Sequence, residues 1–342
     1  MKCFLPALVC LLCVACATPQ EQEFTSQRNT ASLQLDALIA SDGARLPVRA
    51  WLPKGEPKAV IIGLHGMNDY SNAFAMPGEY LSKQGIAVYA YDQRGFGASP
   101  KVGIWPGEEN LISDLKDMVA VLKSRYPHVP VYVMGESMGG AVAVAAFARA
   151  DAPPVDGVIL SAPAVWGGEA MNPFYRGTLW LVSHIMPDKV FTGEGLKIMA
   201  SDNIPMLREL GRDPLVQKGA RADTLLGLVR LMGAGYDHMQ ALNVPLLVLY
   251  GKNDQVIPQP AVEGALSTLH NPALLAYYPS GYHMLLRDIN REIPARDVAE
   301  WVLADKSALY SGLVWKREAA ANETNDATSA LGRGIAVKSI AK

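Results

Sequence analysis

The sequence predicts an α/β fold in which a mostly parallel sheet is covered by helices on both faces. Short apolar runs that end in turn-rich loops alternate along the chain with stretches whose apolar residues recur at helical spacing. Such alternation is typical of parallel sheets, because each crossover helix packs back onto the sheet. The chain has 342 residues, 50% of them hydrophobic, so it can bury a large core without metals or crosslinks.

The expected elements follow one another in a regular order. A hairpin begins the sheet, with strands over 32–40 and 45–52 on either side of the turn at 41–43. Each later strand is a short apolar run, and these runs cover residues 59–64, 86–91, 131–134, 158–161, 245–250 and 273–278. The helices are expected where apolar residues recur at helical spacing or form a helix-compatible run, over 108–125, 141–148, 260–269 and 294–303.

One long segment interrupts the alternation. Between Ser161 and Val244, about eighty residues intervene before the next strand, which is far more than an ordinary connection needs. We expect residues 163–240 to form an inserted helical lid. Its many large apolar side chains, such as Trp180 and Leu231, are expected mainly to pack lid helices together and in part to line an acyl pocket.

A nucleophile elbow is predicted at Gly135-Glu136-Ser137-Met138-Gly139, between the strand at 131–134 and the following helix. A serine hydroxyl is a poor nucleophile at neutral pH and needs a base, so placing it on a sharp strand-to-helix turn exposes Ser137 Oγ to a histidine. The flanking glycines fit this turn because a side chain there would meet the neighbouring strand and helix. Ser137 is therefore the candidate nucleophile.

Two further residues complete a triad in the order Ser, Asp, His. Asp254 follows the strand at 245–250, and His283 follows the strand at 273–278. Strand ends of a parallel sheet meet at one edge, where loops carry the chemistry. Asp254 is the candidate acid and His283 the candidate base, whereas the alternative is a helix cap at Asp254 and an ordinary loop histidine.

The oxyanion of an acyl-transfer reaction needs two donors that are already in place. The backbone N–H of Met138, directly after the nucleophile, is one candidate, and the N–H of Met67 is the other. His65 directly follows the strand at 59–64 and is expected to be structural rather than a base.

Three strings indicate a family resemblance: His65-Gly66-Met67-Asn68-Asp69-Tyr70, Tyr91-Asp92-Gln93-Arg94-Gly95-Phe96-Gly97-Ala98-Ser99 and Gly135-Glu136-Ser137-Met138-Gly139-Gly140. With them, the chain resembles α/β-hydrolases of the monoacylglycerol lipase and lysophospholipase group over about 32–303. The resemblance implies the α/β-hydrolase fold and ester hydrolysis. In this superfamily the second string more often braces the loop beside the site than binds substrate, so Arg94 is expected to do the same.

Both ends of the chain differ from its body. Residues 1–17 resemble a signal segment with an apolar run too short to span a bilayer, and they contain all four cysteines. Val14-Ala15-Cys16-Ala17 resembles a bacterial lipoprotein cleavage site, so we expect a lipid anchor at Cys16 and a place in the bacterial cell envelope. Ordinary cleavage after Ala17 is the competing interpretation. Residues 18–31 are expected to be a flexible polar tether, and 306–342 a tail with a disordered end.

The sequence thus predicts a serine carboxylic-ester hydrolase with its catalytic core over 32–162 and 241–305. Its expected substrates are small-molecule acyl esters with a hydrophobic acyl chain, which it is expected to hydrolyse through an acyl-enzyme. The mechanism requires no metal and no organic cofactor. A net charge of −2 without blocks of like charge argues against a nucleic-acid partner. Two alternatives stay open: a proline-type aminopeptidase, in which Glu136 would help to hold a substrate amine, and a catalytically inert pocket protein.

Overall fold

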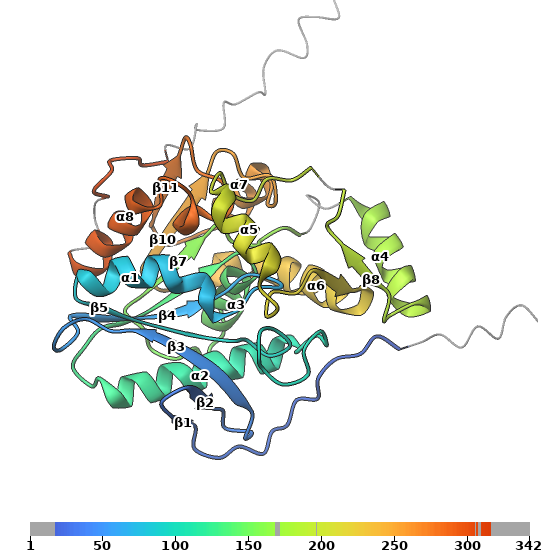
Figure 1. The fold of residues 1–342 in the computed structure, drawn as a ribbon, viewed down its shortest axis with the longest axis horizontal. Coiled ribbons are helices and arrows are strands. Elements are labelled where there is room, and N and C mark those ends of the chain that lie inside the picture. Colours follow the sequence, from blue (N-terminus) through green and yellow to red (C-terminus); the bar gives the residue numbers. More distant parts are fainter. Residues whose placement is uncertain (1–17, 168–171, 196, 305, 307–308, 316–342) are drawn as a thin grey trace, which may run out of the picture.

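A nine-stranded sheet forms the centre of the molecule (Figure 1). The computed structural model describes residues 18–167, 172–195, 197–304, 306 and 309–315, so the expected signal segment and Cys16 lie outside the described residues. The strands, in chain order, are β1 (Ser32–Leu33), β2 (Ala37–Ile39), β3 (Arg45–Trp51), β4 (Ala59–Leu64), β5 (Ile86–Tyr91), β6 (Val131–Glu136), β7 (Gly157–Ser161), β10 (Leu246–Gly251) and β11 (Ala273–Tyr278).

The sheet is parallel over most of its width, as predicted. Its order is β1-β2-β3-β5-β4-β6-β7-β10-β11, and the strands from β5 to β11 in this order run parallel, while β1, β2 and β3 add an antiparallel edge. The carboxyl ends of β4, β6, β10 and β11 therefore lie along one edge of the sheet. The loops that follow these four strands carry every predicted catalytic and oxyanion residue.

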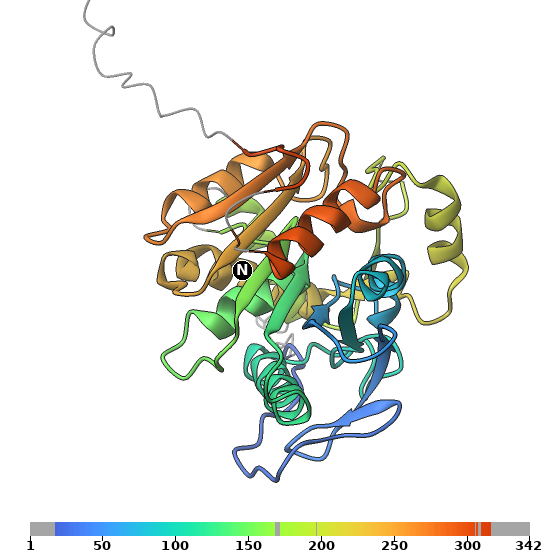
Figure 2. The ribbon, with the colours of Figure 1, turned by 90° about the vertical axis from the view of Figure 1, so that its left-hand side faces the viewer.

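Helices cover both faces of the sheet, which Figure 2 shows after a 90° turn. They are α1 (Ala75–Lys83), α2 (Glu108–Arg125), α3 (Met138–Phe147), α7 (Gln259–Ser267) and α8 (Glu292–Leu303), with short 3-10 turns η1 (Ser71–Phe74) and η4 (Leu285–Arg287). Alternate residues of one strand point to opposite faces. In β4, for example, Ile62 packs in the core with α2, α3 and α7, whereas Ile61 packs in the core with α1 and α8.

Helix α3 lies almost entirely within the protein. All ten of its residues are buried, and none of them has a polar or charged side chain. A helix that is apolar on every side must be enclosed, and α3 is enclosed by the sheet, α2 and α6. The helix that directly follows Ser137 is therefore fixed on all sides.

The expected first hairpin is only partly correct. The predicted strand over 32–40 is divided into β1 and β2, because the backbone turns at 34–36. Gln34 N donates to Ala37 O at 2.8 Å and Val48 N donates to Asp36 O at 2.8 Å, so these residues form a tight turn instead of extended chain.

The segment between β7 and β10 contains its own elements. These are α4 (Pro173–Ile185), β8 (Val190–Thr192), α5 (Ile204–Arg212), β9 (Gly219–Arg221), α6 (Ala222–His238) and η3 (Met239–Ala241), and β8 pairs with β9 as a separate antiparallel ribbon. We call this segment the insertion. Figure 1 shows α4 and β8 at its outer end, away from the sheet. Large apolar side chains between 47% and 73% exposed are concentrated on α4: Phe174, Tyr175, Trp180, Leu181 and Ile185.

The segment over 18–31, expected to be a flexible tether, is hydrogen bonded to the body at several residues. Gln22 N donates to Trp105 O at 2.9 Å, and the Gln22 side chain is buried. Gln20 N donates to Asp223 Oδ2 at 3.1 Å, at the start of α6. Polar composition predicted an open chain here, but the backbone polar groups find partners on a distant loop and at the start of α6.

The predicted tail also starts too early. Residues 309–315 lie along β11, where Tyr277 N donates to Leu313 O at 2.9 Å and Trp315 N donates to Leu275 O at 2.7 Å. The Trp315 ring stacks on Tyr250, with ring centroids 5.4 Å apart. Residues 316–342 lie outside the described part of the chain.

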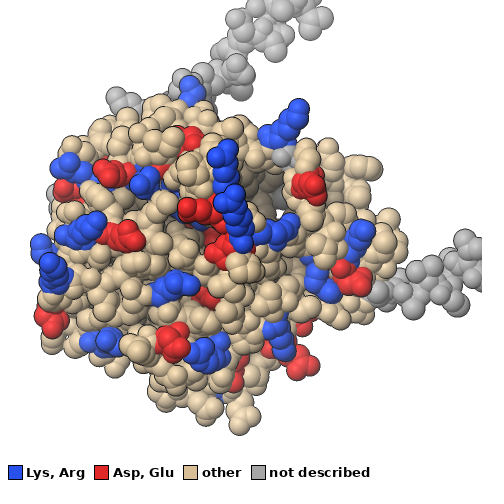
Figure 3. Space-filling view, viewed as in Figure 1, with Lys and Arg blue, Asp and Glu red and all other residues tan. Residues whose placement is uncertain are grey.

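The surface carries mixed charge. On the face shown in Figure 3, Lys and Arg are interspersed with Asp and Glu, and the surface is hollowed between α5 and α4. Within the described ranges, no helix has both the length and the apolar character that crossing a bilayer requires.

Candidate active site

Ser137 occupies the strained turn that the sequence predicts. It lies between β6 and α3 with φ 54° and ψ −115°, a backbone conformation that costs about 1–3 kcal/mol for a residue with a side chain. Neighbouring backbone hydrogen bonds maintain it, since Ser137 N donates to Ser161 O at 3.0 Å and Ala164 N donates to Ser137 O at 2.9 Å. The turn therefore presents Ser137 at the carboxyl edge of the sheet.

The glycines around Ser137 are required by close backbone contacts. A Cβ on Gly139 would lie 2.1 Å from Leu64 O, and a Cβ on Gly135 would lie 2.4 Å from Gly139 O. Neither distance is possible for a side-chain carbon. Glycine at both positions therefore lets α3 begin directly against β4 and β6.

Asp254 and His283 are in direct contact. His283 Nδ1 donates to Asp254 Oδ2 at 2.8 Å, and both side chains are buried. Strands β10 and β11 are paired up to the ends that precede these residues, with Gly251 opposite Tyr278. The adjacent register of these two strands is the reason why residues 29 positions apart meet.

The second oxygen of Asp254 is held by the backbone. Asp254 Oδ1 accepts hydrogen bonds from Val256 N at 2.7 Å and Ile257 N at 3.0 Å. Asp254 therefore caps its own loop and not helix α7, which begins at Gln259. With both oxygens occupied, the carboxylate can hold only one orientation, and this orientation fixes the imidazole with a proton on Nδ1 and a free Nε2.

The loop after β4 lies against Ser137. A Cβ built on Gly66 would be 3.3 Å from Ser137 Cβ, and β4 is paired with β6 up to Leu64 opposite Gly135. Met67 follows in this loop. Met138 is the first residue of α3, where a backbone N–H has no partner within its own helix. The two predicted donors thus come from the loop after β4, which lies against Ser137, and from the first residue of α3.

His65 is a structural residue, as the sequence indicates. Its Nδ1 donates to Gly66 O at 2.8 Å, and its Nε2 accepts from Gln93 N at 2.9 Å, so both ring nitrogens are used. Burial of the ring lowers the pKa of His65, although the bond to Gly66 partly opposes this shift. The neutral imidazole joins the loop after β4 to the loop after β5.

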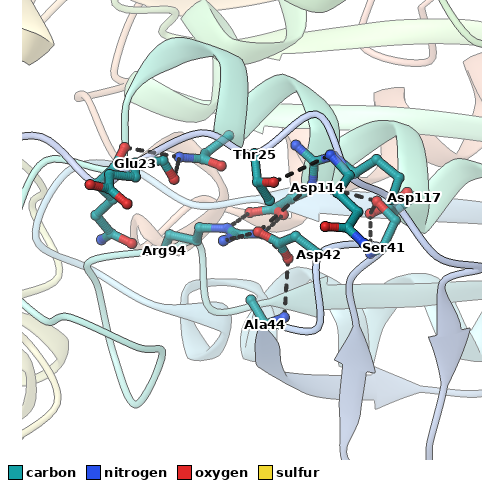
Figure 4. A network of polar contacts seen from close by, with 12 residues as sticks. Glu23, Thr25, Ser41, Asp42, Ala44, Arg94, Asp114 and Asp117 are labelled. Carbon is teal, nitrogen blue, oxygen red and sulfur yellow. Dashed lines mark hydrogen bonds and ion pairs between the residues drawn. The ribbon is translucent and has the colours of Figure 1, made fainter.

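Arg94 has the bracing role that the sequence favours (Figure 4). Its guanidinium donates to Asp114 through Nε and Nη2, both at 2.7 Å, and to Asp42 through Nη1 at 2.7 Å and Nη2 at 2.8 Å. These bonds connect the loop after β5 to helix α2 and to the first hairpin. Four of its five N–H groups are used in these bonds and the side chain is buried, which favours bracing over the binding of a head group.

Sequence reasoning missed a second buried arginine. Arg287, in η4, is 3% exposed and donates from Nη1 to Asp69 Oδ2 at 2.7 Å and from Nη2 to Glu136 Oε1. Glu136 is 4% exposed and is paired with this guanidinium, so it is not open to a substrate amine. The residue on which the aminopeptidase alternative rested is thus occupied by another partner.

The insertion is hydrogen bonded to two of the site loops. Met284 N, next to His283, donates to Ala200 O at 2.9 Å, and Gln217 N donates to Asn68 O at 2.9 Å, next to Met67. Helix α5 lies between these two anchored segments of the insertion.

A cavity of about 640 Å³ lies within the insertion, between α4 and α6. Ser137 is not part of its wall, but Trp166 is, and Ala164, two residues earlier, is hydrogen bonded to the Ser137 carbonyl. The apolar part of the wall is formed by Trp166, Leu179, Trp180, Leu226 and Val229.

The fold, the elbow and the Asp254–His283 pair together define an α/β-hydrolase. The chain belongs to the family described as serine aminopeptidase, S33, whose sequence profile matches residues 55–290. Within it, the chain falls in the monoacylglycerol lipase-like group, and its enzyme class is that of the carboxylic-ester hydrolases.

Two curated relatives illustrate this placement. A monoacylglycerol lipase of Mycolicibacterium smegmatis is 26% identical over 278 residues, which cover 77% of this chain and 94% of the relative. A monoglyceride lipase of Rattus norvegicus is 27% identical over 277 residues, which cover 77% of this chain and 87% of the relative.

Solved structures show the same fold. The monoacylglycerol lipase of Paleococcus ferrophilus superposes with a TM-score of 0.63 at 20% identity, covering 75% of this chain and 98% of that one. A soluble variant of the Saccharomyces cerevisiae monoglyceride lipase, in complex with a substrate analogue, gives a TM-score of 0.66 at 18% identity, covering 81% and 96%.

Proposed function

We propose that this enzyme hydrolyses acyl esters with a hydrophobic acyl chain, of the monoacylglycerol or lysophospholipid type, through an acyl-enzyme on Ser137. The observation that carries the proposal is the 2.8 Å bond between His283 and Asp254 on the same sheet edge as the strained elbow. A buried, oriented imidazole at the same sheet edge as a serine on a strained turn is the arrangement that serine hydrolases use to activate the hydroxyl.

In the proposed reaction, Ser137 Oγ attacks the ester carbonyl while its proton passes to His283 Nε2. Asp254 keeps the imidazole oriented and stabilises its cation. The tetrahedral intermediate collapses, the bond to the alcohol oxygen breaks, and His283 returns the proton to that oxygen. Water then attacks the acyl-enzyme, giving its proton to His283, and the acid leaves as Ser137 regains its hydrogen.

The carbonyl oxygen becomes negative in both steps. We assign its stabilisation to the backbone N–H groups of Met67 and Met138, since Met138 directly follows Ser137 at the start of α3 and the loop that contains Met67 lies against Ser137. Removal of one oxyanion donor typically costs about 2.7–4 kcal/mol of activation free energy. Because these are main-chain groups, their effect depends on loop position and not on the methionine side chains.

The insertion is proposed to act as the predicted lid, with the cavity between α4 and α6 receiving the acyl chain. Two features support this proposal: the apolar wall of the cavity and its connection through Trp166 to the loop that holds Ser137. The hollow between α4 and α5 in Figure 3 is bordered by α4, which also lines the cavity. Ligand sites are typically concave and mostly apolar, with few polar groups.

The reaction is tested with a substrate panel. Nitrophenyl esters, monoacylglycerols and lysophospholipids are incubated with the wild-type enzyme and with Ser137→Ala, and the released acid is measured. Hydrolysis of at least one ester class that disappears in Ser137→Ala is the expected result. Equal hydrolysis by both proteins would exclude an acyl-enzyme on Ser137.

The acyl cavity is tested with Gly233→Leu. Gly233 lines the cavity, and a Cβ there would meet no atom within 4 Å, so the new side chain enters the space and spares the helix. We expect kcat/KM for long-chain esters to fall by about tenfold or more, with short-chain esters unchanged. Gly211→Leu on α5, where a Cβ also meets no atom, is the matched control. A parallel loss for short and long esters would contradict the assignment.

We also propose that Cys16 carries a lipid anchor and that the enzyme lies in the bacterial cell envelope. Residue 16 lies outside the described part, but the segment that follows is held against the insertion: Gln20 Oε1 accepts from Arg221 Nη2 at 3.2 Å in β9. Figure 1 shows that this segment ends beside β8 and α4, which expose apolar side chains. An anchor there would hold these side chains close to a lipid surface.

Mass spectrometry of the mature N-terminus tests the anchor. An acylated Cys16, and loss of membrane association in Cys16→Ser, are expected. A mature chain that starts unmodified at Thr18 would refute it.

A further inference from the structure

We infer that Arg287 is a positioning residue of this site: through Asp69 and Glu136, its guanidinium holds the loop of the base against the oxyanion loop and the elbow. The inference rests on the proposed function, because it assigns Arg287 to the same ester-hydrolysing centre. No sequence motif indicated this role.

The three charged residues come from three different segments of the site. Arg287 lies four positions after His283, Glu136 directly precedes Ser137, and Asp69 lies two positions after Met67. The ion pairs therefore join parts of the chain 151 and 218 positions apart. A single buried side chain thus connects the segments that carry the base, the nucleophile and one proposed oxyanion donor.

The contacts are close to the reacting groups. A Cβ on Gly66 would lie 3.3 Å from Ser137 Cβ and 3.8 Å from Glu136 Oε1, so the acceptor of Arg287 lies directly beside the oxyanion loop. Asp69 also accepts from Tyr70 N through Oδ1 at 2.8 Å, which orients the carboxylate toward the guanidinium. Movement of Arg287 would thus be transmitted to both sides of Ser137.

The guanidinium is charged in spite of its burial. Burial by itself opposes the charged form, but the carboxylates of Glu136 and Asp69 raise the pKa of Arg287 above its usual range. Within the described residues, Arg287 Nε has no hydrogen-bond partner, so the two terminal nitrogens alone fix the guanidinium. The orientation of the guanidinium plane therefore depends on the ion pairs to Asp69 and Glu136.

The backbone of this loop is anchored separately. Arg287 N donates to Met284 O at 2.8 Å, and Asn203 Nδ2 donates to Arg287 O at 2.9 Å. These bonds attach η4 to itself and to the insertion, but none of them reaches the elbow. Only the side chain of Arg287 provides that link among these contacts, and its removal should leave the local turn intact.

Two explanations for an effect of Arg287 must be separated: positioning, and compensation of two carboxylates near a developing oxyanion. In the wild type, one guanidinium and two carboxylates carry a formal charge of −1. The double variant Arg287→Gln with Glu136→Gln keeps this charge, because only Asp69 stays ionised, but it removes both ion pairs. Arg287→Gln alone removes both ion pairs and also changes the formal charge of the group to −2. Arg287→Lys keeps the formal charge of −1 and can form one of the two ion pairs.

The experiment measures the labelling rate of Ser137 by a fluorophosphonate probe, and kcat and KM for a short nitrophenyl ester, with the unfolding midpoint of each protein. We expect Arg287→Gln to lower kcat and the labelling rate by about 10²-fold, because ångström-scale misplacement of catalytic groups has effects of this size. The double variant should stay at least about tenfold below wild type, Arg287→Lys should recover part of the loss, and KM should change little.

Asp42→Asn is the matched control, since it removes one of the two carboxylates of the other buried arginine, Arg94, away from the site. Its kcat per labelled serine should equal that of the wild type even where its unfolding midpoint falls. If the double variant regains the wild-type kcat, or Arg287→Gln never loses it, positioning is wrong. If Arg287→Gln does not fold, the kcat values of the double variant and of Arg287→Lys test the positioning role instead. A wild-type enzyme that is not labelled would instead remove the proposed function itself.

Discussion

Asp254→Asn should inactivate the enzyme while leaving its fold intact, and the structure indicates why. Asp254 Oδ1 accepts from the N–H groups of Val256 and Ile257, so the asparagine must keep its carbonyl oxygen at that position. Its NH₂ group then faces His283 Nδ1. A donor facing Nδ1 favours the tautomer that carries the proton on Nε2. In that tautomer, Nε2 cannot accept a proton from Ser137.

The expected loss follows from this tautomer exchange. In serine hydrolases, the wrong tautomer lowers kcat by about 10⁴-fold, which corresponds to about 5.4 kcal/mol of activation free energy. The assay is steady-state hydrolysis of a short nitrophenyl ester, with circular dichroism and thermal unfolding to show that the variant is folded. KM should change little, because the substrate does not contact Asp254 in the proposed reaction.

Asp114→Asn provides the comparison, since Asp114 is also buried and also pairs with a cationic side chain, Arg94. It should destabilise the protein and leave kcat per folded molecule unchanged. A folded Asp254→Asn enzyme that retains more than a tenth of the wild-type kcat would refute the proposed role of Asp254.

Three further predictions concern stability and loop position. Gly139→Ala should destabilise the fold by about 3 kcal/mol or more, because its Cβ would lie 2.1 Å from Leu64 O, and denaturant unfolding measures this. Burial lowers the pKa of His65, so as the pH falls the unfolded chain binds a proton on this residue before the folded protein does. The free energy of unfolding should therefore fall below about pH 6.5, by at most about 1.4 kcal/mol per pH unit. A His65→Gln variant whose unfolding has the same pH dependence as the wild type would disprove this. Tyr70→Phe removes the 2.7 Å bond from Tyr70 OH to Asp213 Oδ2 in the insertion and should cost about 1–3 kcal/mol; an unchanged unfolding midpoint would show that this bond does not hold the insertion.

Much of the sheet could be predicted from sequence because its strands are continuous apolar runs. Strands β4, β5 and β11 have the bounds that the apolar runs predict, and helix α2 has the bounds given by its apolar spacing. Buried parallel strands leave little choice of register, since both faces are covered. The positions of Asp254 and His283 after two paired strands follow from the same regularity.

The ends of the chain could not be predicted from composition. Polar residues near Gln22 suggested an open tether, and the start of the tail at 306 ignored Trp315, whose ring packs on Tyr250. In both segments, the stabilising contacts are to residues far away in sequence. Composition reports the average tendency to be solvated, and it contains no information about such partners.

The buried network of Arg287 was also beyond sequence reasoning. Its signal was the presence of Glu136 at the variable position of the elbow, which suggested a ligand for an amine. The partner is a guanidinium 151 positions later, and nothing in the local sequence of either residue identifies the other. Buried charges require partners, but only the fold determines which ones meet.

Site-specific labelling of the intact enzyme tests the central claim most directly. The protein is incubated with a fluorophosphonate probe, digested, and its modified peptide is sequenced by mass spectrometry. We predict one modification, on Ser137 Oγ, with loss of all ester hydrolysis in the labelled fraction and slow labelling in His283→Ala. An unlabelled Ser137 in an enzyme that still hydrolyses esters would contradict the account.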